Sequence, residues 1–218
     1  ADTRIRFSSM EESMITPRFL EACKALKNFA PQFHLSLQSG SDAVLKSMNR
    51  KYTRAQYLEK CRMIYEEFGH AAITTDIIVG FPTETEADFE DSLSIVKEAG
   101  FLQVHAFPYS PREGTAAAKR YKELPAAVKK ERVARMLAAA AEQKTAYLTG
   151  CLGKIYTVVP ETTETDEENG GELYTGHAET YAKFYVAGLS EKTPVKVRAT
   201  ALYKDGLRGA VIDEKETK

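Results

Sequence analysis

The regular alternation of β-type and helical segments is the feature that most constrains the fold of this chain. One repeat shows it well: an apolar run at residues 72–80 ends at Gly80, turns through Phe81 and Pro82, and enters an acidic helical pattern at residues 86–100. Strands that alternate with helices of this length need right-handed crossovers and form a parallel sheet. The sequence therefore predicts an α/β fold for this region.

Other segments repeat the same pattern. Thr16 and Pro17 are typical N-cap and first-turn residues for a helix that reaches about Lys27, and Thr53 with Gln56 predicts a capping box. The further strands are expected at residues 4–9, 33–38 and 102–110, and a long helix at residues 125–147.

The pattern changes after the long helix. Helical periodicity is lost, and β-type runs separated by Gly, Pro and Asp turn signals take its place. We therefore expect two domains, an α/β domain at residues 1–147 and a small antiparallel β-barrel at residues 148–218. An acidic loop at residues 161–172 falls inside the second domain.

Composition excludes several classes of protein. The formal net charge of -1 argues against binding of nucleic acid by bulk charge alone, so such binding needs a local patch. No stretch approaches the roughly 18 apolar residues of a membrane span, and the first residues lack a signal-peptide pattern, which indicates a cytoplasmic protein with no membrane partner. Cys23, Cys61 and Cys151 are far apart within apolar patterns and are expected to be buried thiols, with no metal site.

Candidate ligand-binding residues lie where the predicted strands end, because the loops there carry unpaired backbone donors. For the Gly and Pro residues the alternative is an ordinary turn. Asp76 lies inside its strand and is expected to make a structural hydrogen bond. The strand-end candidates are Ser8, Ser9, Glu11, Gln38, Ser39, Gly40, Gly80, Phe81, Pro82, Glu84, Tyr109, Ser110 and Arg112.

Three stretches, residues 33–57, 72–93 and 104–117, resemble in order and spacing the second half of the radical S-adenosylmethionine domain of the methylthiotransferases. Residues 72–85 and 176–186 look most like the branch that modifies N6-threonylcarbamoyladenosine beside the tRNA anticodon. The resemblance implies the C-terminal half of a radical S-adenosylmethionine (β/α) barrel, followed by a TRAM-like β-barrel. It also implies a tRNA anticodon stem-loop as partner.

The same resemblance implies S-adenosylmethionine and two [4Fe–4S] clusters in the parent enzyme. The cluster-binding cysteine motif of the family, CxxxCxxC, does not occur in this sequence. We therefore expect the cluster ligands to lie outside this chain, in an N-terminal half of the same protein, and the chain alone to be inactive. No residue here is expected to be catalytic.

The resemblance also suggests roles for the strand-end residues. It implies an adenine pocket at Gly80, Phe81 and Pro82, and ribose or methionine contacts further along the same edge. Arg50 would bind the methionine carboxylate through its guanidinium fork. Solvated or phosphate-facing cations remain the alternative for Arg50 and Arg112. The ribose or methionine contacts are Ser9, Glu11, Gln38 and Ser39, and the substrate contacts are Tyr109 and Arg112.

In the predicted barrel, aromatic residues interleave with cations, a pattern that suits base stacking and phosphate contact. Strand periodicity requires that about half of these aromatics face the core instead. His177 stands where the family more often has Arg, which puts its phosphate contact in doubt. The RNA-binding candidates are His177, Tyr181, Lys183 and Arg198, with a second basic face on the long helix at Lys129, Lys130, Arg132 and Arg135.

Two alternatives remain at this stage. One is a fragment of the related methylthiotransferase that modifies a ribosomal protein. The other is a non-catalytic RNA-binding module that keeps the half-barrel only as a scaffold.

Overall fold

A computed structural model describes residues 3–189 and 193–212, and these divide into two compact units. The sheet unit comprises residues 7–27 and 33–144. The barrel unit comprises residues 145–218 together with the short segments 1–6 and 28–32, which the sequence had placed in the first domain. The division therefore falls inside the long helix rather than at its end.

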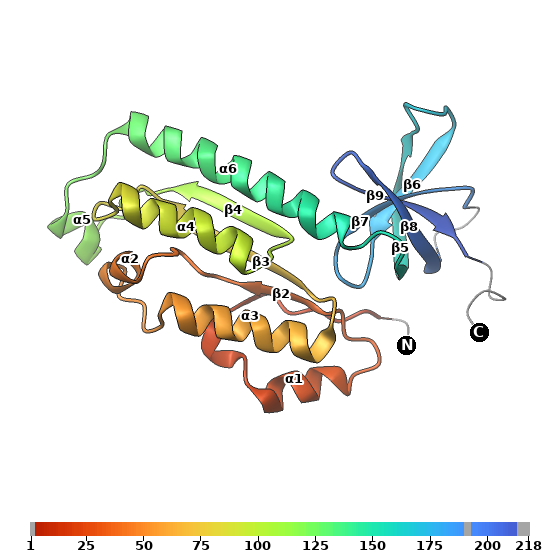
Figure 1. Cartoon of the computed structure of the whole chain (residues 1–218), viewed down its shortest axis with the longest axis horizontal. Helices are drawn as coiled ribbons and strands as arrows, with labels where there is room; N and C mark the ends of the chain where they lie inside the picture. Colours follow the sequence, from red (N-terminus) through yellow and green to blue (C-terminus); the bar gives the residue numbers. More distant parts are fainter. Residues whose placement is uncertain (1–2, 190–192, 213–218) are drawn as a thin grey trace. The chain divides into compact units, whose positions relative to one another are not determined.

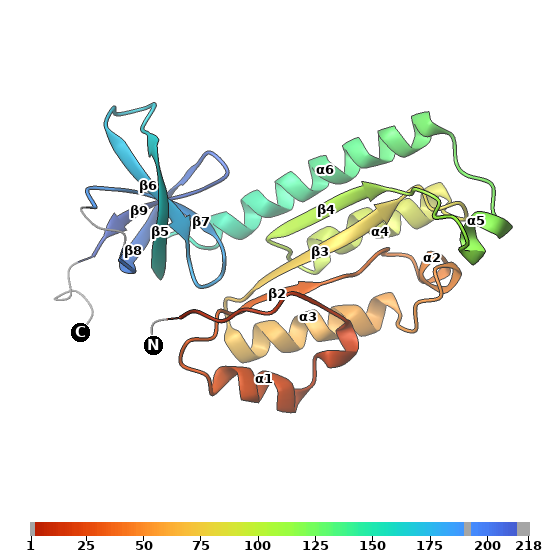
Figure 2. The same cartoon turned by 180° about the vertical axis from the view of Figure 1, so that it is seen from behind.

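The sheet unit has four parallel strands in the order β1-β2-β3-β4. Helices α3 and α4 lie in front of the sheet in Figure 1 and behind it in Figure 2, so they cover one face. The elements in chain order are β1 (Ser9–Met10), a 3-10 turn (Glu12–Met14), α1 (Pro17–Lys24), β2 (Gln32–Leu35), α2 (Asp42–Ser47), α3 (Arg54–Phe68), β3 (Ala72–Val79), α4 (Glu86–Glu98), β4 (Gln103–Pro108), α5 (Ala116–Arg120) and α6 (Ala126–Thr149).

Local sequence signals set the helix starts. Thr16 Oγ1 accepts the Phe19 N–H at 3.2 Å, and Thr53 with Gln56 forms a reciprocal capping box, so both predicted starts are confirmed. The first strand is shorter than predicted, because Ile5 instead forms an isolated bridge with Phe29 in the barrel unit.

Gly40 lets the loop after β2 press against α4. A Cβ atom at this position would lie 2.6 Å from the Asp91 carbonyl oxygen and from the Ser92 Cα, distances that backbone atoms cannot relieve. The Gly40 N–H donates to Ser92 Oγ at 2.9 Å. This close approach fixes the loop that leads from β2 into α2.

The barrel unit is a closed five-stranded barrel with strand order β5-β6-β7-β9-β8. Four of its five pairs are antiparallel, but β7 and β9 are parallel, so the expectation of an antiparallel barrel throughout was wrong at this pair. Its strands are β5 (Ile155–Thr165), β6 (Glu172–His177), β7 (Lys183–Ala187), β8 (Val195–Tyr203) and β9 (Gly206–Val211).

The described helices include none that is both long and apolar enough to cross a membrane. Cys23, Cys61 and Cys151 are free and buried, as the sequence predicted.

Candidate functional site

A cleft of about 670 Å³ lies in the sheet unit, where β3 and β4 end. Gln38 enters it from the end of β2 with a left-handed backbone (φ 69°), held by hydrogen bonds from its N–H to Asp76 O and from the Ile78 N–H to its carbonyl. The cleft therefore occupies the edge at which a parallel sheet usually binds ligands. Its lining residues are Gln38, Arg50, Asp76, Ile78, Phe107, Pro108, Tyr109, Ser110, Arg112, Thr115 and Ala117.

Two arginines of the cleft carry unpaired charge. Arg50 and Arg112 are both exposed and line the cleft. Within the described part of the chain, no carboxylate or carbonyl pairs with either guanidinium. Because Arg stays charged and presents a planar fork of donors, the two side chains are suited to a carboxylate or phosphate ligand.

The loop after β3 is held by hydrogen bonds to the carboxylate of Glu84. The Gly80 N–H donates to both carboxylate oxygens of Glu84 at 3.1 Å, and Arg132 Nη1 donates to Glu84 Oε1 at 2.6 Å. The side chain of Glu84 is fully buried, and burial raises its pKa above the ordinary value although Arg132 opposes that shift. Gly80 has a left-handed backbone (φ 72°), and a Cβ atom at this position would lie 2.6 Å from Cγ of Lys129.

Phe81 lies inside this loop rather than on its surface. It is 4% exposed and packs edge-on against Tyr109, with 5.1 Å between ring centroids. Pro82 is half-buried. Gly80, Phe81 and Pro82, the residues predicted to shape an adenine pocket, are not among the lining residues of the cleft, and Phe81 is connected to it through Tyr109.

Other predicted cofactor residues lie away from the cleft. Ser39 is fully buried; its hydroxyl lies 3.4 Å from Ser92 Oγ and accepts the Ser41 N–H at 3.2 Å. Ser9 pairs in register with His34, and Glu11 follows it at an exposed position. Neither Ser39, Ser9 nor Glu11 is among the lining residues of the cleft.

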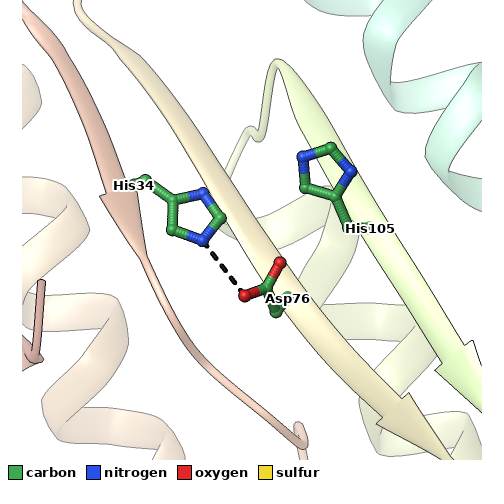
Figure 3. A group of neighbouring side chains, drawn as sticks. All are labelled: His34, Asp76 and His105. Atoms are coloured by element: carbon green, nitrogen blue, oxygen red, sulfur yellow. Dashed lines mark hydrogen bonds and ion pairs between the residues drawn. The ribbon is translucent and has the colours of Figure 1, made fainter. Parts of the chain in front are cut away.

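A cluster of three side chains that the sequence did not single out shares one residue, Asp76, with the lining of the cleft. His34, Asp76 and His105 come from β2, β3 and β4, and their side chains point toward one another in Figure 3. His34 Nε2 lies 3.1 Å from Asp76 Oδ2 and its Nδ1 lies 2.9 Å from Thr74 Oγ1. Asp76 makes a hydrogen bond, as the sequence predicted, and its partner is His34.

The three thiols do not fit an iron–sulfur cluster. Cys23 belongs to α1, Cys61 to α3 and Cys151 to the barrel unit, and each is buried. Burial raises the pKa of Cys61 to about 12, whereas cluster ligation requires thiolates that converge on one site. Cluster ligands are therefore not supplied by the described residues.

In the barrel unit, most predicted RNA-binding cations already have partners. Lys183 Nζ lies 3.3 Å from Asp205 and 3.5 Å from Glu164, and Arg198 donates to the Gly153 carbonyl at 3.2 Å. The acidic loop supplies several of these partners, among them Asp166 and Glu168 for Arg208. Lys183, Lys204 and Arg208 thus pair with carboxylates of the barrel unit itself.

Tyr181 and His177 form an aromatic stack. Their rings lie 4.4 Å apart at an interplanar angle of 13°, and the Arg6 guanidinium lies 4.2 Å from the Tyr181 ring centroid. His177 Nδ1 also lies 3.0 Å from Glu161. Tyr181 is 40% exposed, so its edge remains available at the surface.

The basic residues of α6 mostly face carboxylates instead of solvent. Arg132 is buried against Glu84, Arg135 pairs with Glu86, Glu90 and Glu131, and Lys129 pairs with Glu123 at 2.6 Å. A free basic face along this helix is therefore not present at these three positions.

Comparison with known proteins agrees with this fold. The profile of the radical SAM superfamily matches residues 3–96. Coproporphyrinogen III oxidase from Escherichia coli, a radical SAM enzyme, superposes with a TM-score of 0.53 at 19% identity, over 62% of this chain and 31% of that chain. The sheet unit therefore has the fold of a partial radical SAM domain, a class that uses S-adenosylmethionine with iron–sulfur chemistry.

Sequence relatives identify the family within this class. A tRNA-2-methylthio-N(6)-dimethylallyladenosine synthase from Oceanobacillus iheyensis is 40% identical over 81% of this chain and 33% of its own length. The threonylcarbamoyladenosine tRNA methylthiotransferase MtaB of Bacillus subtilis is 33% identical over 98% of this chain and 48% of its own length. The chain belongs to the radical SAM tRNA methylthiotransferase family, and it spans about a quarter to a half of the length of the curated relatives it matches.

Proposed function

We propose that this chain is the C-terminal part of a tRNA methylthiotransferase that acts on N6-threonylcarbamoyladenosine next to the anticodon. The observation that carries the proposal is the cleft at the ends of β3 and β4, with two arginines that pair with no carboxylate among the residues that the structure describes. In a family whose reaction uses S-adenosylmethionine, a cleft at this edge is where the cofactor and the target nucleoside would meet.

The two arginines have separate roles in this proposal. Arg50 binds the methionine carboxylate of S-adenosylmethionine, and Arg112, in the loop after β4, binds the carboxylate of the threonylcarbamoyl group. Each contact is a charge-assisted hydrogen bond for which a guanidinium is well suited. Gln38 and Tyr109 orient the bound molecules from the cleft wall, and Phe81 supports Tyr109 from below.

When bound, S-adenosylmethionine supplies the radical chemistry of the family. The chain's own contribution is to bind, to orient and to exclude water. The cluster ligands belong to the remainder of the protein, because the three buried thiols here do not fit that role. On this proposal the chain alone is inactive and depends on its N-terminal half.

The barrel unit binds the tRNA. A closed five-stranded barrel is an architecture that often binds oligonucleotides. With Lys183 paired, the His177–Tyr181 stack with Arg6 remains as a contact for RNA. Arg198 on β8 donates to a neutral carbonyl, that of Gly153, so its charge is still available to a phosphate. We propose that this barrel is a TRAM domain and that the whole protein works in the cytoplasm.

A second candidate has its own support. Relatives named for dimethylallyladenosine reach 40–47% identity, higher than MtaB, but they align over only 62–81% of this chain. MtaB aligns through the barrel, and a dimethylallyl group has no carboxylate for Arg112 to bind. We therefore place the threonylcarbamoyl substrate first.

Mass spectrometry of tRNA nucleosides distinguishes the candidates. The complete reading frame is expressed in bacteria that lack their own methylthiotransferases, and digested tRNA is analysed for methylthio products. We expect 2-methylthio-N6-threonylcarbamoyladenosine, reduced by Arg112→Gln. The dimethylallyl product would support the second candidate, and no modified nucleoside would favour a ribosomal-protein substrate or a binding module.

A further inference from the structure

A short basic segment follows the cleft along the chain. Thr115 and Ala117 line the cleft, and α5 begins between them. Lys119, Arg120 and Lys122, in α5 and directly after it, are all exposed. In Figures 1 and 2 α5 lies beyond the ends of β3 and β4, at the edge of the sheet unit where the cleft lies. These three cations are called the α5 rim below.

The apolar residues of this segment fix it to the cleft wall. Ala117 and Tyr121 both pack against an apolar cluster formed by Val44, Phe81 and Tyr109. The Tyr121 and Phe81 rings lie edge-on, with 6.2 Å between their centroids. Because the apolar residues are packed inward, the exposed cations of the α5 rim are left on the solvent side.

The start of α5 is tied to the arginine of the cleft. Thr115 Oγ1 accepts the Ala118 N–H at 3.3 Å and donates to the Arg112 carbonyl at 2.8 Å. Arg120 follows Ala117 by three positions, which is less than one turn of a helix. A polymer with one residue in the cleft therefore meets the α5 rim within a few ångströms of it.

The charge of the α5 rim is not neutralised within the part of the chain that the structure describes. None of its three cations forms an ion pair there. Glu113 is the one carboxylate among residues 112–122, and Glu123, just after them, is already paired with Lys129 at 2.6 Å. The segment therefore differs from α6, whose Arg132 and Arg135 are held by carboxylates.

We propose that the α5 rim binds the phosphodiester backbone of an RNA strand directly beside the nucleoside held in the cleft. A nucleoside within a strand brings its two flanking phosphates to the edge of any cleft that it enters. Lys and Arg are the usual partners of such phosphates, which set the position of the strand without reading its sequence. The inference rests on the proposed function, because it takes the cleft as the nucleoside site, but it does not depend on which modified adenosine is bound.

The test measures binding of an anticodon stem-loop RNA to the chain by fluorescence anisotropy at several salt concentrations. The variant is Lys119→Gln/Arg120→Gln/Lys122→Gln. Each phosphate contact contributes about 0.7 to the slope of log affinity against log salt for a single strand, so the slope should fall by about 2. Affinity at 0.1 M salt should fall by about tenfold or more, and circular dichroism verifies that the variant is folded.

A matched control removes the same charge elsewhere on the sheet unit. Arg18, Lys27 and Lys97 are exposed and are not among the lining residues of the cleft. The variant Arg18→Gln/Lys27→Gln/Lys97→Gln should bind the RNA as the wild type does. An equal loss in both triple variants would show an effect of net charge alone and would overturn the proposal.

Chemically altered RNA tests where the α5 rim binds. A methylphosphonate, which is uncharged, replaces the phosphate on each side of the adenosine next to the anticodon. This RNA should bind the wild type more weakly than the unaltered RNA does, whereas the rim variant should bind the two RNAs almost equally. Additive losses would mean that the α5 rim and these phosphates do not touch, and would overturn the proposal.

The remaining outcomes separate this inference from the proposed function. Wild type and rim variant that bind the stem-loop equally overturn the α5 rim alone, since RNA binding persists. A wild type that binds no RNA also overturns it, and the nucleoside analysis above then decides the proposed function independently. Poly-glutamate is the probe for an acidic protein: rim-dependent binding as tight as that of RNA would identify such a partner and overturn the RNA assignment.

Discussion

The cleft of the sheet unit and the surface of the barrel unit use charged residues in opposite ways. On the barrel, Arg208 is bidentate to Asp166 and also reaches Glu168, and Lys183 and Lys204 both meet Glu164. In the cleft, Arg50 and Arg112 have no such partners among the described residues.

An arginine that is already paired with a carboxylate and an arginine that is unpaired differ in how much they gain from binding a ligand. An arginine already held by a carboxylate must lose that bond before it can take a ligand, so its net gain from the ligand is small. An unpaired arginine at a strand end has no such cost. We therefore expect a ligand to bind at the unpaired arginines of the cleft rather than at the paired cations of the barrel.

The largest effect is expected from the buried pair beneath the cleft. Arg132→Met leaves the Glu84 carboxylate buried without its cation, which should lower the free energy of unfolding by about 3–5 kcal/mol. Denaturant unfolding followed by circular dichroism measures it. The double variant Glu84→Gln/Arg132→Met should recover part of the loss, and Lys130→Ala, at an exposed position of α6, should change little. A loss equal to that of Lys130→Ala would contradict the stabilising role.

Asp166→Asn should have the next largest effect, and it should depend on pH. The bond to Arg208 holds the pKa of Asp166 well below its ordinary value. A depressed carboxyl pKa gives stability that is present above the unfolded pKa of about 3.9 and is lost as the pH falls through the folded value. The difference in melting temperature between wild type and variant should be full at pH 6–7 and shrink in acid. A difference independent of pH would show that the ion pair is not its source.

Arg50→Gln tests the unpaired arginines of the cleft. It should weaken binding of S-adenosylmethionine to this chain by about tenfold, as expected for the loss of a charge-assisted hydrogen bond, while the unfolding curve stays unchanged. Calorimetric titration measures the affinity for S-adenosylmethionine, and denaturant unfolding measures the stability. Arg18→Gln, at an exposed position of α1, is the control and should leave the affinity unchanged. Equal affinities of the wild type and Arg50→Gln would remove Arg50 from the cofactor site.

The smallest effect is expected at Lys204. Its ammonium lies 3.4 Å from Glu164 and 3.2 Å from Glu167 at the barrel surface, where exposed pairs contribute little. Lys204→Ala should leave the melting temperature unchanged within error. A decrease as large as that of Asp166→Asn would show that exposed pairs stabilise the barrel as much as the buried carboxylate of Asp166 does, and would contradict this ranking.

Much of the fold could be predicted from the sequence because its signals are local. The caps at Thr16 and Thr53, the helix starts and the parallel strands of the sheet depend on residues a few positions apart. The alternation of strands and helices then leaves few topologies open. The parallel β7–β9 pair was missed because register between distant strands has no local signal.

The candidate site could be predicted only in part. The strand ends were found, but Ser39 and Phe81 are buried there, whereas Arg50 and Arg112 remain open. Which strand-end residue faces a ligand depends on the packing of helices against each loop. That information is spread over many positions of the chain.

The sequence by itself determined the α/β alternation, the barrel that follows it, the buried thiols and the family. Only the tertiary structure decided which charges are paired, because partners such as Glu84 with Arg132 and His34 with Asp76 lie 48 and 42 positions apart. The free energy of an ion pair or a shared ligand depends on distances of a few ångströms between such residues. Those distances exist only once the chain has folded.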